Sequence, residues 1–185
     1  SIEGNSISIG TVIAFFMDPK RALMLMNSFE AAVGAMGAYL LARFFACSKM
    51  GSSTAAIIYA LSPVYIFKLA IGYSMIGSVF AYAPWVVLLF IAGVVKARAL
   101  YVVVAGLVLG LTVLRGEAHI IVVLALLLIV WALYDAIANK RTRAFMFLLV
   151  CFAMAFFIAS VKILPFVEHL SSEPVKLRPY VALLH

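Results

Sequence analysis

Long runs of apolar residues, separated by short groups of charged residues, make up most of this chain of 185 residues. The runs are Ala22–Phe45, Thr54–Leu69, Met75–Val95, Ala99–Leu114, Ala118–Tyr134 and Ala144–Val167. Apolar residues fill each run continuously and do not alternate with polar ones, which favours helices over strands. Inside a bilayer the backbone amides need internal hydrogen-bond partners, and a helix supplies them. The pattern therefore predicts an all-α, polytopic transmembrane bundle of about six spans.

The length of the runs separates them into two groups. A helix needs roughly 20 residues to cross about 30 Å of hydrocarbon. The first, third and last runs meet this length, whereas the second, fourth and fifth are shorter. We expect the short runs either to extend into flanking residues or to lie inside the bundle. Pro63, Pro84 and Pro165 each interrupt a run, where a proline kinks or ends a helix.

Composition supports a membrane protein and excludes other classes. Hydrophobic residues make up 67% of the chain and charged residues 11%, and a soluble domain of this length could not bury that much apolar surface in one core. Membrane proteins keep Lys and Arg in cytoplasmic loops, which explains the net charge of +7 without nucleic acid. Cys47 and Cys151 show no metal-ligand spacing and are interpreted as two small buried or interfacial thiols.

The two ends of the chain differ from its middle. Residues 1–17 begin with a polar stretch that lacks the basic segment of a signal peptide. We expect them to form an outer-face segment or a partial re-entrant stretch. Residues 18–170 form the predicted transmembrane domain, and residues 171–185 begin an outer loop. Because the first residue is Ser1 and not Met, we expect the sequence to be a piece of a longer protein.

The charged connectors predict the orientation in the membrane. One set of helix ends carries the basic residues Arg43, Lys49, Lys96, Arg98, Lys140, Arg141 and Arg143, with Asp135 as its acidic residue. The opposite ends carry as many basic residues, together with Glu3, Asp18, Glu117, Glu168 and Glu173. Lys and Arg in short loops mark the cytoplasmic side, so the compact basic turns place the first set inside. Tyr65, Tyr73 and Tyr82 are expected to form an aromatic belt at the outer level.

Small residues recur at helical spacing in two of the runs. Gly34 and Gly37 lie on one face of the first run, and Gly106 and Gly110 on one face of the fourth. Small side chains let helix backbones approach closely inside a membrane. We interpret both faces as packing surfaces, and a second interpretation assigns them to a membrane-protein partner.

The most concentrated polar group between two runs is formed by Arg115, Glu117 and His119. Arg115 and His119 are four residues apart and share a face if the following helix begins early. Ionisable groups at membrane depth are costly, which makes them functional candidates. The alternative is a hydrated turn, with Arg115 extending to the lipid headgroups.

A second polar group follows the last run and contains Glu168, His169, Glu173, Lys176 and Arg178. A carboxylate beside a histidine is suited to acid–base chemistry, and the alternative is a solvated outer loop. The sequence contains no metal-ligand spacing, phosphate-binding glycine loop or nucleophile elbow.

Two further charged residues lie within the apolar runs. Glu30 lies about two turns inside the first run. It either pairs with a cation from another helix or reaches the outer interface because the span begins later, and we favour the second interpretation. Lys162 lies near the outer end of the last run, and we expect its side chain to extend toward the headgroups.

Four segments in chain order carry a family resemblance: Gly34–Arg43, Tyr59–Pro63, Ala83–Trp85 and Ile163–Ser172. Together they resemble the membrane region of the GT-C superfamily of glycosyltransferases. The most similar branch is that of the large prokaryotic membrane proteins described as YfhO-like or as 6-pyruvoyl-tetrahydropterin synthase-related. The resemblance extends from about Asp18 to Ser172.

The resemblance implies a multi-pass enzyme of the prokaryotic plasma membrane that uses a polyprenyl-phosphate-linked sugar at the outer face. Within such an enzyme, we assign Glu117, His119 and Glu168 as catalytic candidates, because their charged or polar side chains lie at the outward ends of the predicted helices. Basic side chains stabilise the departing lipid phosphate in such enzymes, a role that falls here to Arg115, Lys176 and Arg178.

The resemblance also places one catalytic group elsewhere. In such enzymes a carboxylate of the first outer loop acts as base, and that loop precedes the span that matches Ala22–Phe45. Residues 1–17 are too few to supply it, and a divalent metal ion in the complete enzyme is left open. The alternative functions are a non-catalytic membrane subunit or scaffold and a transporter or flippase.

Overall fold

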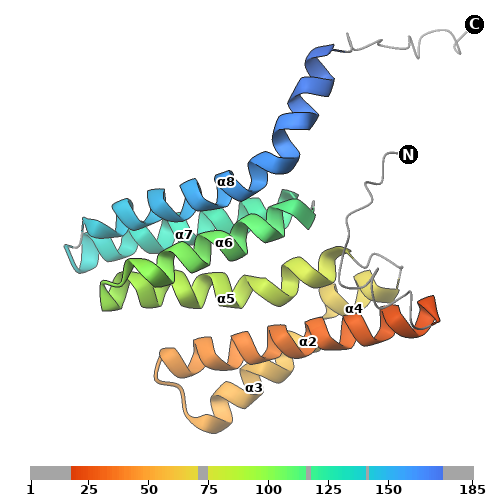
Figure 1. Ribbon diagram of the computed structural model, residues 1–185. Coiled ribbons are helices and arrows are strands. Elements are labelled where there is room, and N and C mark those ends of the chain that lie inside the picture. The colour runs from red at the N-terminus through yellow and green to blue at the C-terminus, as the bar shows by residue number, and fades with distance from the viewer. Residues whose placement is uncertain (1–17, 71–74, 116–117, 141, 173–185) are drawn as a thin grey trace, which may run out of the picture.

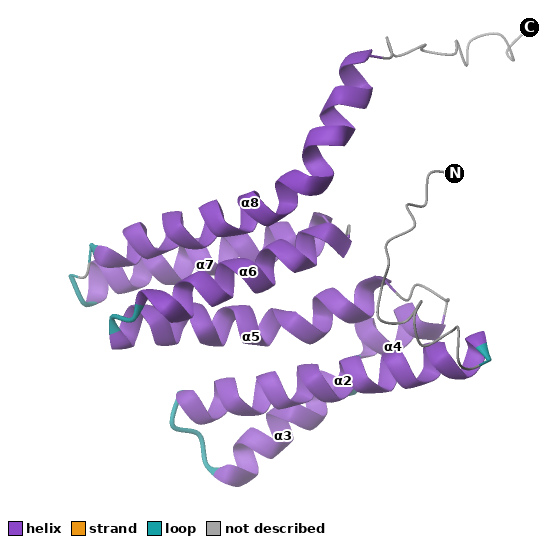
Figure 2. Ribbon diagram, in the orientation of Figure 1, coloured by secondary structure: helices purple, strands orange, loops and turns teal. Residues whose placement is uncertain are grey.

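A computed structural model describes residues 18–70, 75–115, 118–140 and 142–172, and these residues are almost entirely helical (Figure 2). The helices are α2 (Pro19–Phe44), α3 (Lys49–Ala60), α4 (Pro63–Ala70), α5 (Met75–Lys96), α6 (Ala99–Arg115), α7 (Ala118–Ala138) and α8 (Arg143–Ser172) (Figure 1). The predicted all-helical class is confirmed, and the helices follow the apolar runs. The second run differs, because Pro63 divides it into α3 and α4.

Within the described residues, four segments are long and apolar enough to cross a membrane: Lys49–Phe67, Val79–Lys96, Ile120–Ala138 and Arg143–Lys162. The second and fifth runs thus gain length from flanking residues, as expected. The fourth run remains the shorter helix α6, which lies between α5 and α8 (Figure 1). The first run was expected to be long enough to span the membrane. It forms α2, which has 26 residues but is not among the four apolar segments. Arg21, Glu30 and Arg43 lower its hydropathy.

Helix α5 lies between α2 and α3 on one side of the bundle and α6 and α8 on the other (Figure 1). It packs against α2 on one side and against α6 on the other, while α8 packs on α6 and α3 on α2. The buried core lies where α5, α6, α7 and α8 meet, around the fully buried side chains of Phe90, Val102, Leu128 and Cys151.

The turns α2–α3, α5–α6 and α7–α8 all lie at the same end of the bundle (Figure 1). Each contains a residue with positive φ, namely Ala46, Ala97 or Lys140. After α2, the Cys47 N–H donates to the Ala42 carbonyl and the Ala46 N–H donates to the Arg43 carbonyl. This is the Schellman pattern, which satisfies the last carbonyls of a helix. These turns bring together the basic residues that were predicted to share one side.

The α2–α3 turn is set back from the other two turns (Figure 1). The ring of Phe45 contacts Trp131 edge to face, with 5.7 Å between the ring centroids. Trp131 lies about two turns before α7 ends at Ala138. The α2–α3 turn therefore lies about 10 Å short of the end of α7.

Both small-residue faces are filled by helices of this chain. A Cβ atom at Gly37 would lie 2.8 Å from the Trp85 ring, and one at Gly106 would lie 2.5 Å from the Cys151 carbonyl oxygen. The glycines thus permit the close α2–α5 and α6–α8 contacts. A membrane-protein partner would have to bind to another surface.

The Pro84 nitrogen cannot donate the hydrogen bond that the Phe80 carbonyl would receive in a regular helix. The Tyr59 hydroxyl donates to this carbonyl instead, at 2.6 Å. Tyr59 thereby joins α3 to α5 at the proline. Helix α8, which contains Pro165, changes direction in its final part and leaves the bundle (Figure 1).

Candidate lipid-binding site

Three of the residues that the sequence assigns to a site, Arg115, His119 and Glu168, lie in the described parts of α6, α7 and α8. Glu117, Lys176 and Arg178 fall outside the described residues. Arg115 is the last residue of α6 and His119 lies in the first turn of α7, so positions 116–117 alone separate the two helices. Glu168 lies in the final part of α8, which diverges from α6 and α7 (Figure 1). The backbone therefore brings Arg115 and His119 close together, and it directs Glu168 away from them.

Lys162 adds a positive charge at the end of α6. Its Nζ atom donates to the Leu114 carbonyl at 2.9 Å. The last carbonyls of a helix have no partner within the helix, and a cation there interacts favourably with the helix dipole. Lys162 thus caps α6 beside Arg115, whereas the sequence predicted that it would extend to the headgroups. Its partner lies 48 residues away, and no local pattern could have indicated the contact.

An apolar cavity of about 530 Å³ lies between α2, α3, α5 and α7. This volume is within the range of roughly 300–1,000 Å³ for small-molecule sites. Its lining consists of Ala38, Leu41, Ala42, Phe45, Cys47, Ala55, Tyr59, Ala83, Pro84, Val87, Ile120, Val123, Leu124 and Leu127. The short side chains of the four alanines leave space where longer residues would close the gap. A cavity with such walls suits a hydrocarbon chain and no charged group.

The cavity follows the first half of α7. Its α7 wall begins at Ile120, directly after His119, and reaches Leu127. At the opposite end lie Phe45 and Cys47, which belong to the α2–α3 turn. The cavity thus extends about 10 Å along α7, from the end with Arg115 and His119 toward the basic turns. The sequence did not indicate it, because its walls come from four helices.

The lining residues are accessible from the surroundings of the bundle. Val123 is 65% exposed, and Leu127 and Phe45 are about half exposed, at 49% and 48%. In a segment that spans a membrane, such apolar side chains face lipid. A hydrocarbon chain can therefore enter from the side, without passing through water.

A buried aromatic group holds α3 and α4 against α2 and α5. The Phe80 ring stacks on Tyr59 and on Tyr65, with 4.3 Å and 5.2 Å between centroids. The Tyr65 hydroxyl donates to the Asn27 carbonyl at 3.0 Å. Tyr65 is thus a buried packing residue and not part of a lipid-facing belt.

Glu30 is buried as well, and its side chain is 5% exposed. The carboxylate is therefore enclosed within the bundle, and the interpretation that it extends to the outer interface is not supported. The sequence could not reveal that Glu30 is buried, because its burial depends on how the helices pack.

A second buried carboxylate lies near the end of α7. Asp135 is 1% exposed, and its Oδ1 atom accepts a hydrogen bond from Asn139 Nδ2 at 2.8 Å. Its Oδ2 atom, Trp131 Nε1 and Arg143 Nε are also buried, and none of these three atoms has a hydrogen-bond partner among the residues that the structure describes. The sequence analysis used Asp135 only as a charge at a helix end and did not predict its burial.

The described part of the chain holds no group of three His, Cys, Asp or Glu side chains placed to bind a metal ion. Comparisons with protein families, with curated proteins and with solved structures find no match for this chain.

Proposed function

We propose that this chain is the membrane part of a glycosyltransferase that takes a polyprenyl-phosphate-linked sugar at the outer face of a prokaryotic plasma membrane. The observation that carries this proposal is the apolar cavity, whose α7 wall begins directly after His119. A lipid-linked sugar donor needs an apolar site for its chain beside a basic site for its phosphate. The cavity suits the apolar chain, and the basic residues at the end of α6 suit the phosphate.

The isoprenoid chain is assigned to the cavity. Its walls are apolar, and its exposed lining residues give access from the lipid. Burying hydrocarbon in a preformed apolar site favours binding through close packing. The sugar and the phosphate would then lie near the start of α7.

The phosphate is assigned to the end of α6. Lys162 Nζ uses one of its three N–H groups for the Leu114 carbonyl, which leaves two for a ligand. Arg115 ends the same helix, and a guanidinium group can bind phosphate with two parallel hydrogen bonds. Two cations at this position would stabilise the negative charge that develops on the departing lipid phosphate. Lys176 and Arg178 remain further phosphate-binding candidates.

Proton transfer is assigned to the polar residues at the outward helix ends. In the sequence, Glu117 and His119 follow Arg115, the phosphate-binding candidate, and precede Ile120, where the cavity wall begins. Glu168 lies in the final part of α8. In this proposal the catalytic base on the acceptor comes from an outer loop of a longer protein.

The test is a glycosyl-transfer assay on the full-length protein with a polyprenyl-phosphate-linked sugar. Removing one group that stabilises transition-state charge typically lowers kcat about 10²-fold to 10³-fold. We expect that Arg115→Ala and Lys162→Gln each lower kcat to this extent. Lys96→Gln, which removes a charge from the last turn of α5, is the matched control and should leave kcat unchanged. Full activity in both outer-face variants would contradict the proposal and favour the accessory-subunit alternative.

A further inference from the structure

Three basic residues lie where α6 and α8 begin, and together they are called the basic patch. Arg98 and Lys140 lie in the turns α5–α6 and α7–α8, and Arg143 is the first residue of α8. Both turns lie at the same end of the bundle (Figure 1), and neither contains an acidic residue. Lys96 is not counted in the patch, because its Nζ atom lies over the Tyr101 ring, 5.7 Å from the centroid.

The packing of α6 on α8 sets the starts of these two helices opposite each other. Both helices run away from the basic end, so they are parallel (Figure 1). A Cβ atom at Gly106 would meet the Cys151 carbonyl oxygen, and one at Gly110 would meet the Ala155 carbonyl oxygen. The offset along the chain is the same in both contacts. It pairs the residue before α6 with the first residue of α8, and both are arginines.

The charges of the basic patch are not balanced locally. Like charges repel, and a cation is unfavourable at the N-terminus of a helix. Arg98 and Lys140 are exposed, whereas the Nε atom of Arg143 is buried, so the protein encloses the base of that guanidinium group. Asp135, the acidic residue predicted at this end, is 1% exposed and accepts a hydrogen bond from Asn139. An anion beside the patch would therefore offset the repulsion.

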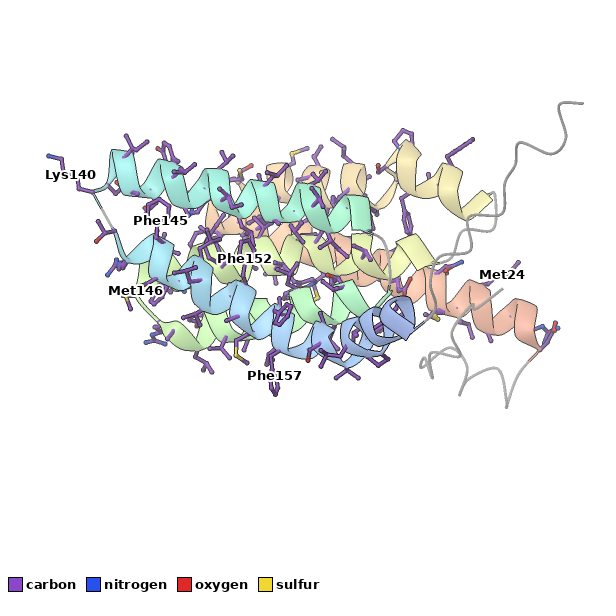
Figure 3. All side chains as sticks on the ribbon, turned by 90° about the horizontal axis from the view of Figure 1, so that it is seen from above. Met24, Lys140, Phe145, Met146, Phe152 and Phe157 are labelled. Carbon is purple, nitrogen blue, oxygen red and sulfur yellow. The ribbon has the colours of Figure 1, made fainter. Side chains whose placement is uncertain are left out.

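Apolar side chains are exposed directly beside the basic patch. Leu100 in the first turn of α6 is 73% exposed, and Met146 in the first turn of α8 is 68% exposed. Figure 3 shows Lys140 at the end of the bundle and Met146 close to that end. Apolar side chains on a membrane-spanning helix face hydrocarbon. A ligand at this place thus meets cations at one end and an apolar surface along the helices, a combination that suits a phospholipid.

We infer that the basic patch binds the phosphate of an acidic phospholipid from the adjacent leaflet, with the acyl chains of the lipid along α6 and α8. A guanidinium group can bind phosphate with two parallel hydrogen bonds, and here one arginine comes from each helix. Basic sites between helices on the cytoplasmic side are suited to acidic headgroups. The site does not depend on the proposed transferase function, because it lies at the opposite end of α6 from the phosphate site of that proposal.

The test is a lipid titration of the full-length protein in a neutral detergent, with bound lipids counted by native mass spectrometry. Phosphatidylglycerol is compared with phosphatidylcholine of the same acyl chains, which differs in carrying a cationic headgroup. We expect one phosphatidylglycerol molecule to bind more tightly than phosphatidylcholine. Arg98→Gln should weaken the binding of phosphatidylglycerol about fivefold, the contribution of one cation beside an acidic lipid.

Lys49→Gln is the matched control. It removes the same charge from the exposed first residue of α3, which lies at the same end of the bundle but packs with α2 and not with α6 or α8. Its affinity for phosphatidylglycerol should equal that of the unmodified protein. Arg143→Gln should weaken binding as Arg98→Gln does, and a thermal unfolding scan shows whether this partly buried site still folds. The exposed Arg98 keeps the test decisive if it does not.

Equal affinity of the unmodified protein for the two lipids would overturn the site. Equal weakening in Lys49→Gln and Arg98→Gln would also overturn it, because net charge alone would then explain the attraction. Displacement of phosphatidylglycerol by inorganic phosphate at the same concentration would show that the patch recognises a free anion, and would overturn the assignment of a lipid.

Discussion

At the scale of single residues, hydrogen bonds between helices compensate for groups that the helices leave unsatisfied. Tyr59 donates to the Phe80 carbonyl, which receives no hydrogen bond from Pro84 because proline has no N–H. Lys162 donates to the Leu114 carbonyl at the end of α6. Trp85 donates from its indole Nε1 to the Val33 carbonyl at 2.9 Å. A polar group without a partner is costly in an apolar medium, so each of these contacts fixes a helix position.

The Tyr59 contact predicts a specific coupling with Pro84. Tyr59→Phe removes the hydroxyl group and should lower the free energy of unfolding by about 1 kcal/mol. In a Pro84→Ala background the backbone N–H at position 84 can donate to the Phe80 carbonyl, so the same change should have a smaller effect. Thermal unfolding of the four proteins in detergent, followed by circular dichroism, gives the double-mutant cycle. Additive effects would mean that Tyr59 does not replace the proline's missing donor.

Contacts of this kind mark the limit of prediction from sequence. Lys162 and Leu114 are 48 residues apart, and Tyr65 and Asn27 are 38 apart. No helical spacing connects such pairs, because the contacts depend on how the helices pack. The Asp135–Asn139 hydrogen bond spans four residues, and its spacing on one helix could have indicated it.

At the scale of helices, the sequence predicts the elements well. Continuous apolar runs produce α5 and α7 almost as expected, since a helix is the structure that satisfies their backbone in lipid. Pro63 shows where the prediction was incomplete. It was expected to kink or end a helix, and it lies at the first position of α4, where its missing N–H has no consequence. The α3–α4 break therefore occurs inside a single apolar segment.

The glycines of α6 predict the effect of adding one methyl group. Gly106→Ala would place Cβ 2.5 Å from the Cys151 carbonyl oxygen on α8. The two backbones would have to separate, and such overpacking typically costs about 1–3 kcal/mol. We expect a lower unfolding temperature, measured by thermal scans in detergent.

Gly51→Ala is the control for this change. Its Cβ atom would meet Ser48 Oγ at 3.4 Å, an ordinary contact, within the exposed helix α3. Replacing a helical glycine there should raise stability by about 0.5–1 kcal/mol. Equal destabilisation in both variants would contradict the close α6–α8 packing.

At the scale of the whole molecule, the three turns with left-handed residues gather the basic side chains at one end. Lys140 marks this end of the bundle (Figure 3). The charge pattern of the sequence predicts that this end faces the cytoplasm. The three turns do place the first set of basic residues at one end of the bundle, while the opposite end carries basic residues such as Arg21 and Lys162 as well (Figure 1).

Cys47 tests the orientation without any mutation, because it is exposed in the α2–α3 turn. A membrane-impermeant maleimide should label Cys47 in inside-out vesicles and not in intact cells. Lysed membranes give the full extent of labelling. Labelling of intact cells to that extent would reverse the assigned topology.

The set-back position of the α2–α3 turn has a consequence for the bilayer around it. Arg43 and Lys49 lie at this turn, about 10 Å short of the end of α7. Water and headgroups must follow these charges, because their burial in hydrocarbon is expensive. We therefore expect the inner leaflet to thin locally beside α3, as bilayers do around short hydrophobic spans. This thinning would bring the aqueous phase closer to the end of the cavity that Phe45 and Cys47 line.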